Sequence, residues 1–116
     1  MSREHLSEDP RFDPELKARW LEALRSGRYQ QGRQSLRPTL ESYCCLGVLC
    51  DVIDPQGWDG RRWRDKATGC DHSSKVPIPT ERRLALPHEI TGTLMHMNDE
   101  DEKSFAEIAD YIEANL

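Results

Sequence analysis

Cysteine is the residue type in this sequence with the widest reactive chemistry, and the cysteines are unevenly placed. Three of the four, Cys44, Cys45 and Cys50, fall within residues 43–53, the most apolar stretch of the chain. A thiol acts as a nucleophile or a metal ligand in its thiolate form, which a helix N-terminus or a nearby cation stabilises. Zinc binding and nucleophilic catalysis are therefore two interpretations of these residues. The third, which we favour, is burial as small apolar groups, a common state of free cysteines.

A zinc site would need four ligands, usually supplied as two close pairs. On a helix, a separation of five positions turns Cys45 and Cys50 about 140° apart, so they could not share one ion. The zinc interpretation therefore requires that residues 43–53 are not helical, and we expect no bound metal. The residues that could form such a site are Cys44, Cys45, Cys50, Cys70 and His72.

A catalytic thiol would most easily be Cys44 or Cys45, because both follow Ser42, the expected N-cap of a helix whose dipole would favour a thiolate. The sequence around them matches no cysteine-protease or oxidoreductase motif, and no Cys-x-x-Cys motif occurs. The pattern therefore permits catalysis without indicating it. The bases that could serve such a thiol are His72, His88 and His96.

One basic and aromatic patch predicts a binding site for a nucleotide or another small phosphate-containing ligand. It consists of Trp58, Arg61, Arg62, Trp63 and Arg64. Tryptophan can stack on a base, and arginine can pair with a phosphate group. The alternative, which the acidic character of the whole chain favours, is an ordinary strand with its arginines in solvent and Trp63 in the core. A second side of the pocket could come from Arg28, Tyr29, Arg33 and Arg37.

The sequence predicts no cofactor, because it lacks the glycine-rich loops of Walker and dinucleotide-binding sites. Its charge is uneven. Residues 87–116 carry eight Asp or Glu and one Lys, within a net charge of −5 for the chain. This distribution argues against binding of duplex nucleic acid. The acidic segment could instead face a basic protein, although a solvated loop is the commoner state of such a segment. Its residues are Asn98, Asp99, Glu100, Asp101 and Glu102.

Capping signals predict the helices that position these residues. Asp13 and Pro14 are typical of a helix start, and Gly27 of a helix end. Ser104 and Glu107 form a capping box before the last helix. Two further helices are expected over residues 43–53 and from Pro87 to Met97. Gly47, inside the second helix, indicates that another backbone packs closely there.

Strand signals are weaker. Residues 61–64 are expected to form a strand with Trp63 pointing inward, residues 65–74 a polar loop, and residues 75–79 an extended edge partner. The predicted fold class is α+β, with about four helices packed around a small, edge-rich β-sheet. We expect one domain over residues 13–116, preceded by a flexible leader over residues 1–12. The expected core consists of Trp20, Leu24, Leu46, Leu49, Val52, Phe105, Ile108 and Ile112.

Three stretches together resemble a known group of sequences. They are residues 20–32, residues 43–51 and residues 97–109. The set resembles small uncharacterised proteins encoded by bacteriophages and prophages, above all in the run Tyr-Cys-Cys-Leu-Gly-Val-Leu-Cys that begins at Tyr43. The resemblance implies expression in a bacterial cytoplasm and an accessory role rather than a part in building the virion. It implies no particular activity and no functional residue.

These observations predict a phage-type accessory protein that acts by binding, to a host protein (one involved in defence, for example) or to a small nucleotide signal. The alternatives are a small cysteine-dependent enzyme and a zinc-stabilised interaction module. No run approaches the roughly 18 apolar residues of a membrane span, and no secretory signal is present. The expected location is the cytoplasm of a bacterial host cell, without membrane contact, and a homodimer is compatible with the sequence.

Overall fold

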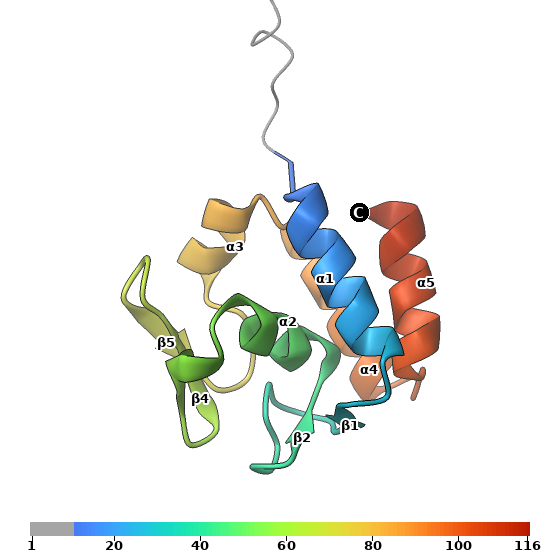
Figure 1. Ribbon diagram of the computed structural model, residues 1–116, viewed down its shortest axis with the longest axis horizontal. Helices are drawn as coiled ribbons and strands as arrows, with labels where there is room; N and C mark the ends of the chain where they lie inside the picture. Colours follow the sequence, from blue (N-terminus) through green and yellow to red (C-terminus); the bar gives the residue numbers. More distant parts are fainter. Residues whose placement is uncertain (1–10) are drawn as a thin grey trace, which may run out of the picture.

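The computed structural model describes residues 11–116, and this part of the chain folds into five α-helices and two small sheets (Figure 1). The α+β class is confirmed, but the prediction of about four helices is wrong. The additional helix is α3, and it starts within residues 75–79, which were expected to form an edge strand. None of the helices in residues 11–116 has the length and apolar character needed to cross a membrane. The helices are α1 (Pro14–Arg25), α2 (Cys45–Ile53), α3 (Ile78–Leu84), α4 (His88–Asp99) and α5 (Phe105–Asn115).

The first and last helices begin at the predicted caps and lie side by side (Figure 1). The Asp13 side chain accepts a hydrogen bond from the Glu15 amide at the start of α1, and Ser104 and Glu107 form the capping box of α5. Arg25 of α1 pairs with Asp110 and Glu113 of α5, at 2.8 Å each. The expected leader lies outside the described residues except for positions 11 and 12.

The core includes Phe12, a residue that was expected to belong to the leader. Its ring is buried, with its centroid 5.9 Å from the ring centroid of Trp20. This contact extends the apolar stripe of α1 past its N-cap, so Phe12 belongs to the core and not to the leader.

Helix α2 lies at the centre of the core and is helical, as predicted. All its residues from Cys45 to Cys50 are buried, because this helix has no polar face over those turns. The expected N-cap was wrong. Cys44 occupies that position, and its Sγ accepts a hydrogen bond from the Gly47 amide at 3.4 Å. Ser42 instead belongs to β2 (Ser42–Tyr43), which pairs in parallel with β1 (Gln30–Gln31).

Gly47 permits the close backbone approach that its position in the sequence predicts. A Cβ atom added there would overlap the carbonyl oxygen of Leu36. That carbonyl also accepts a hydrogen bond from the Cys44 amide at 3.0 Å. The loop between β1 and β2 is therefore held directly against α2.

The second sheet is an antiparallel meander of β3 (Trp58–Asp59), β4 (Arg62–Asp65) and β5 (Cys70–His72). The partner of β4 was predicted wrongly, because β5 lies in the segment expected to be a polar loop. Gly69, with φ +79°, turns the chain back onto β4 at this point. Trp63 points inward and is fully buried, as predicted.

A buried carboxylate joins this sheet to α3. Asp65 accepts a hydrogen bond from Thr80 Oγ1 at 2.7 Å and a two-pronged pair from Arg83 at 3.1 Å. Burial acts to raise the pKa of Asp65, but the hydrogen bonds from Thr80, Arg83 and the Ala67 amide outweigh it and lower the pKa overall.

Asn98, near the end of α4, is fully buried and joins three segments of the chain. Its Oδ1 accepts hydrogen bonds from Gln31 Nε2 at 2.9 Å and from the Cys45 amide at 3.3 Å. Its Nδ2 donates to the Gly32 carbonyl and to Asp99, both at 2.9 Å. We call this arrangement the Asn98 junction. The three stretches that carry the sequence resemblance meet in it.

The different surroundings of two helical glycines, Gly47 and Gly92, predict that replacing each by alanine changes the stability in opposite directions. Gly47→Ala should lower the free energy of unfolding by about 1–3 kcal/mol, because the new methyl group forces α2 away from Leu36. Gly92→Ala in α4 should raise it by about 0.5–1 kcal/mol, because nothing lies within 4 Å of the added Cβ. Urea denaturation measures both. A stabilised Gly47→Ala variant would contradict the packing of the loop on α2.

The Asn98 junction predicts a large effect of Asn98→Ala. The substitution leaves the Cys45 amide and the Gly32 carbonyl without this partner. Each buried group left unsatisfied lowers the free energy of unfolding by about 1–3 kcal/mol. Asn115→Ala, at an exposed asparagine of α5, should change the stability by no more than about 0.5 kcal/mol. Equal effects of the two substitutions in thermal unfolding would show that the junction contributes little.

Candidate functional site

Trp58 is placed by the short connection that follows α2. Asp54 ends α2 and starts the 3-10 helix η2 (Pro55–Gly57), where its side chain accepts a hydrogen bond from the Gln56 amide at 3.0 Å. Gly57 allows η2 to close on β4, since an added Cβ would lie 2.6 Å from Nε1 of Trp63. Trp58 then begins β3 at the surface, half-buried, beside α2.

The Trp58 ring is fixed on several sides. Its Nε1 donates to Asp51 Oδ1 at 3.0 Å, while Tyr29 donates to Asp51 Oδ2 at 2.6 Å. Burial, with this hydrogen bond to Asp51, raises the pKa of Tyr29. Tyr43 meets Tyr29 and Trp58 edge to face. We call Tyr29, Tyr43 and Trp58 the aromatic cluster.

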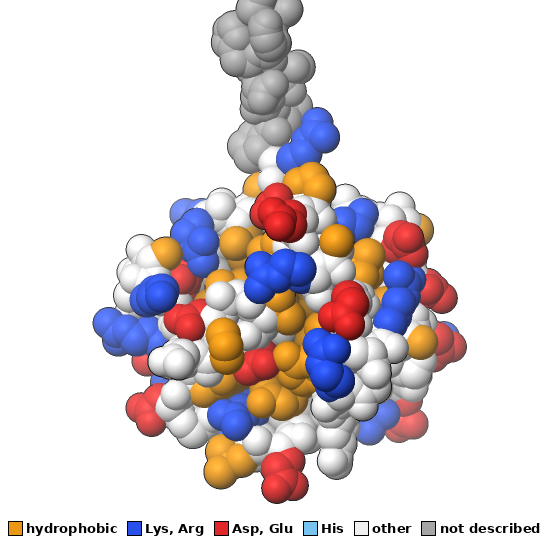
Figure 2. Space-filling model, in the orientation of Figure 1, with side chains coloured by type: hydrophobic (Ala, Val, Ile, Leu, Met, Phe, Trp, Pro, Cys, Tyr) orange, Lys and Arg blue, Asp and Glu red, His pale blue; other side chains and the backbone are white. Residues whose placement is uncertain are grey.

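Arg37 completes the aromatic cluster. Its guanidinium lies 5.2 Å from the ring centre of Trp58 and 5.5 Å from that of Tyr43, within the range of cation–π attraction. Two of its nitrogens donate to the carbonyls of Leu40 and Gly60. Figure 2 shows hydrophobic side chains gathered in the middle of the view, where Figure 1 draws α2.

A cavity of about 510 Å³ adjoins Trp58. Two of the five residues predicted to bind a ligand, Trp58 and Arg64, line it together. Lys66, the first residue of the turn that follows β4, joins them. The full lining is Asp54, Gln56, Gly57, Trp58, Asp59, Arg64 and Lys66.

The other residues of the predicted patch lie elsewhere. The prediction that Trp63 binds a ligand is wrong. Its side chain is buried on the opposite face of β4, where its Nε1 donates to the Asp54 carbonyl at 3.0 Å. Arg61 donates to the Pro38 carbonyl at 2.9 Å, and Arg62 pairs with Asp71 at 3.0 Å. Neither arginine lines the cavity. Strand alternation therefore hides Trp63, while Arg61 and Arg62 are held by other partners outside the cavity.

Within residues 11–116, the two cations of the cavity have no carboxylate partner, a state that they share with Arg33, Arg37 and Arg61. Arg62 pairs with Asp71 and Arg28 with Glu22, whereas within residues 11–116 no carboxylate lies within 4 Å of Arg64 or Lys66. Of the second side predicted for the pocket, Tyr29 and Arg37 join the aromatic cluster, and Arg28 and Arg33 do not.

The cysteines at the start of and within the central helix are buried. Burial raises the pKa of Cys44 to about 12 and also raises the pKa values of Cys45 and Cys50. A thiol in this state forms little thiolate at neutral pH. The interpretation of Cys44 or Cys45 as nucleophile loses its basis, since desolvation outweighs the helix start that was expected to help.

The histidines and the outer cysteine are not assembled with these thiols. Cys70 and His72 lie on β5, an edge strand, and His96 is exposed on α4, 3.4 Å from Asp101. Over residues 11–116, no three side chains of His, Cys, Asp or Glu are placed to hold a metal ion. The structure therefore does not bring together the predicted zinc ligands Cys44, Cys45, Cys50, Cys70 and His72.

The acidic segment is only partly available to a partner. The prediction that Asn98 contacts a protein partner is wrong, because its side chain is buried in the Asn98 junction. Asp99 is half-buried and accepts a hydrogen bond from the Gln34 amide at 3.0 Å. Helix α4 also continues through both residues, although a break at Asn98 was expected. The residues of the segment that are exposed are Glu100, Asp101 and Glu102.

Comparison with known proteins gives one match. A family model described as a domain of unknown function (DUF8296) matches residues 12–116. No curated protein and no solved structure matches the chain. The match begins at Phe12, a buried residue of the core.

The burial of the thiols predicts their order of reaction. A disulfide reagent at mildly alkaline pH should label Cys70 in the native protein and the other three cysteines only after unfolding, because the thiolate is the reacting species. A Cys70→Ser variant should therefore show almost no labelling until denaturant is added. Rapid labelling of that variant without denaturant would show that Cys44, Cys45 or Cys50 is reactive and would support a catalytic thiol.

Proposed function

We propose that this chain, which belongs to the family described as a domain of unknown function (DUF8296), binds a small phosphate-containing ligand in the cavity beside Trp58. A nucleotide is the ligand class that fits this chemistry. The observation that carries the proposal is the position of Arg64 and Lys66, two cations without a carboxylate partner in residues 11–116, in the same cavity as a fixed tryptophan. Cations placed in this way can pair with a phosphate group.

The aromatic part of the site supports a ligand with a flat ring. Asp51, Tyr43 and Arg37 hold Trp58 in one orientation, so little side-chain freedom is lost when a base contacts it. Stacking of one base on an aromatic side chain contributes about 1–3 kcal/mol. The carboxylates of Asp54 and Asp59 line the same cavity and can accept hydrogen bonds from ribose hydroxyls or a base amino group.

A binding role also fits the state of the cysteines better than an enzymatic one. The buried thiols of α2 do not support a cysteine-dependent enzyme, and the dispersed ligand set does not support a zinc-stabilised module. In the bacterial cell that the phage resemblance implies, the proposed ligand would be a nucleotide signal of the host. The protein would then act as a phage-type accessory protein that sequesters or senses that signal.

A basic host protein is the second candidate partner. The observation that favours it is the turn after α4, where Glu100, Asp101 and Glu102 are all exposed. Such a surface would attract a basic partner and weaken with increasing salt. It lies outside the Trp58 cavity, so substitutions in the cavity distinguish the two candidates.

The proposal predicts that removing either cavity cation weakens nucleotide binding. We expect nucleoside monophosphates to bind more tightly than the matched nucleosides in isothermal titration calorimetry. Arg64→Ala and Lys66→Ala should each weaken the monophosphate by about 10-fold or more, because each removes a charge-assisted contact. The affinity of the variants for the nucleosides should change little, since nucleosides carry no phosphate.

Arg62→Ala is the matched control, because Arg62 faces outward on the same strand but pairs with Asp71 and does not line the cavity. It should leave monophosphate affinity unchanged. If Arg62→Ala weakened monophosphate binding as much as Arg64→Ala, the protein would attract the phosphate through its general surface charge and not through a specific site. Failure of every monophosphate to bind would leave the acidic turn as the better candidate.

A further inference from the structure

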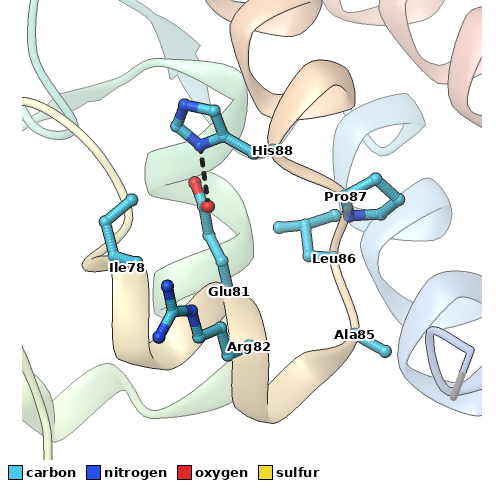
Figure 3. A pocket seen from close by; sticks show the side chains of 7 residues that line it. All are labelled: Ile78, Glu81, Arg82, Ala85, Leu86, Pro87 and His88. Atoms are coloured by element: carbon cyan, nitrogen blue, oxygen red, sulfur yellow. Dashed lines mark hydrogen bonds and ion pairs between the residues drawn. The ribbon is translucent and has the colours of Figure 1, made fainter.

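A second cavity, of about 500 Å³, lies between α3 and α4 and shares no lining residue with the Trp58 cavity. Figure 3 shows the Glu81 side chain extending between Ile78 and Leu86, with the ring of His88 meeting its carboxylate. The walls are mostly apolar, which favours an apolar ligand body. The lining is Ile78, Glu81, Arg82, Ala85, Leu86, Pro87 and His88.

Glu81 is the buried charged group of this cavity. The residue is 4% exposed, and its carboxylate contacts His88 Nδ1 and Thr91 Oγ1, both at 3.0 Å. The His88 side chain is 70% exposed at the edge of the cavity. Histidine is a cation only when protonated, so this partner supplies no permanent positive charge.

The protein contains a second buried carboxylate that serves as an internal comparison. Asp65 also accepts a hydrogen bond from a threonine, Thr80, but its second partner is the guanidinium of Arg83. Buried carboxylates are stable when they are paired with a cation and fully hydrogen-bonded. The Glu81 site has the threonine and the hydrogen bonds, and within residues 11–116 it has no arginine or lysine within 4 Å.

We propose that the cavity between α3 and α4 binds a small organic cation whose ammonium group pairs with Glu81. The ligand takes the place that Arg83 occupies beside Asp65, and the exposed His88 ring moves aside to admit it. The proposal is independent of the nucleotide site, because it rests on different residues and a different ligand charge.

The cavity also sets the shape of the ligand. Ile78, Leu86 and Pro87 would enclose a compact apolar body next to the ammonium group. Arg82, on the same wall, disfavours a second positive charge. A monoamine with one apolar substituent therefore fits better than a diamine or a metal ion.

The test compares phenethylammonium with 2-phenylethanol, a neutral molecule of the same shape, in an NMR titration of the native protein. The amine should shift amide signals of α3 and the start of α4 in a saturable way. It should bind about 10-fold or more tightly than the alcohol, because only the amine forms a charge-assisted hydrogen bond with Glu81. Equal affinity of the two probes, or shifts confined to other elements, would overturn the proposal.

Variants then assign the effect to single residues. Glu81→Gln should reduce amine affinity to that of the alcohol, and His88→Ala should increase it several-fold, because no imidazole has to be displaced. Glu89→Gln, at an exposed glutamate next to His88, should change nothing. Retained amine preference in Glu81→Gln, or weaker amine binding in His88→Ala, would overturn the proposal. Should Glu81→Gln fail to fold, the comparison of the two probes on the native protein still decides.

Discussion

The carboxamide of Asn98 lies where α4, the start of α2 and the loop after α1 meet, and the arrangement of these segments depends on it. Its oxygen accepts hydrogen bonds from Gln31 and the Cys45 amide, and its nitrogen donates to the Gly32 carbonyl. Gln31 also donates to the Lys103 carbonyl, just before α5. One neutral side chain thus joins residues up to 67 positions apart while leaving no buried charge.

The central helix imposes the second constraint. Because α2 is apolar on all sides from Cys45 to Cys50, other segments must surround it. Helices α1 and α4 cover part of it, and the loop that carries Leu36 covers the face with Gly47. The same loop supplies Arg37, and the end of α2 supplies Asp51. The close packing of the core therefore also assembles the surface cluster around Trp58.

Local signals predicted the fold where the structure follows local rules. The caps at Asp13 and Ser104 and the apolar run of α2 placed three helices correctly. The strand β5 was missed although it follows β4 after a short turn that ends at Gly69, because its residues are polar and were taken for a loop. The role of Asn98 could not be predicted, because it depends on contacts between distant segments that leave no pattern in the sequence. The candidate site was half predicted. Alternation along β4 separates Arg64 from Trp63, whereas Lys66 lies in the turn beyond the strand, where alternation does not apply. Glu81 and His88 have no sequence signature as a pair.

The pairing of α1 with α5 has a consequence for protein synthesis. The apolar stripe of α1 emerges early, but the helix that covers one side of it follows about 80 residues later. At roughly 5–20 residues per second, Trp20 and Leu24 remain incompletely covered for roughly 4–16 seconds. During this interval the nascent chain exposes apolar surface, which is the kind of surface through which incompletely folded chains aggregate.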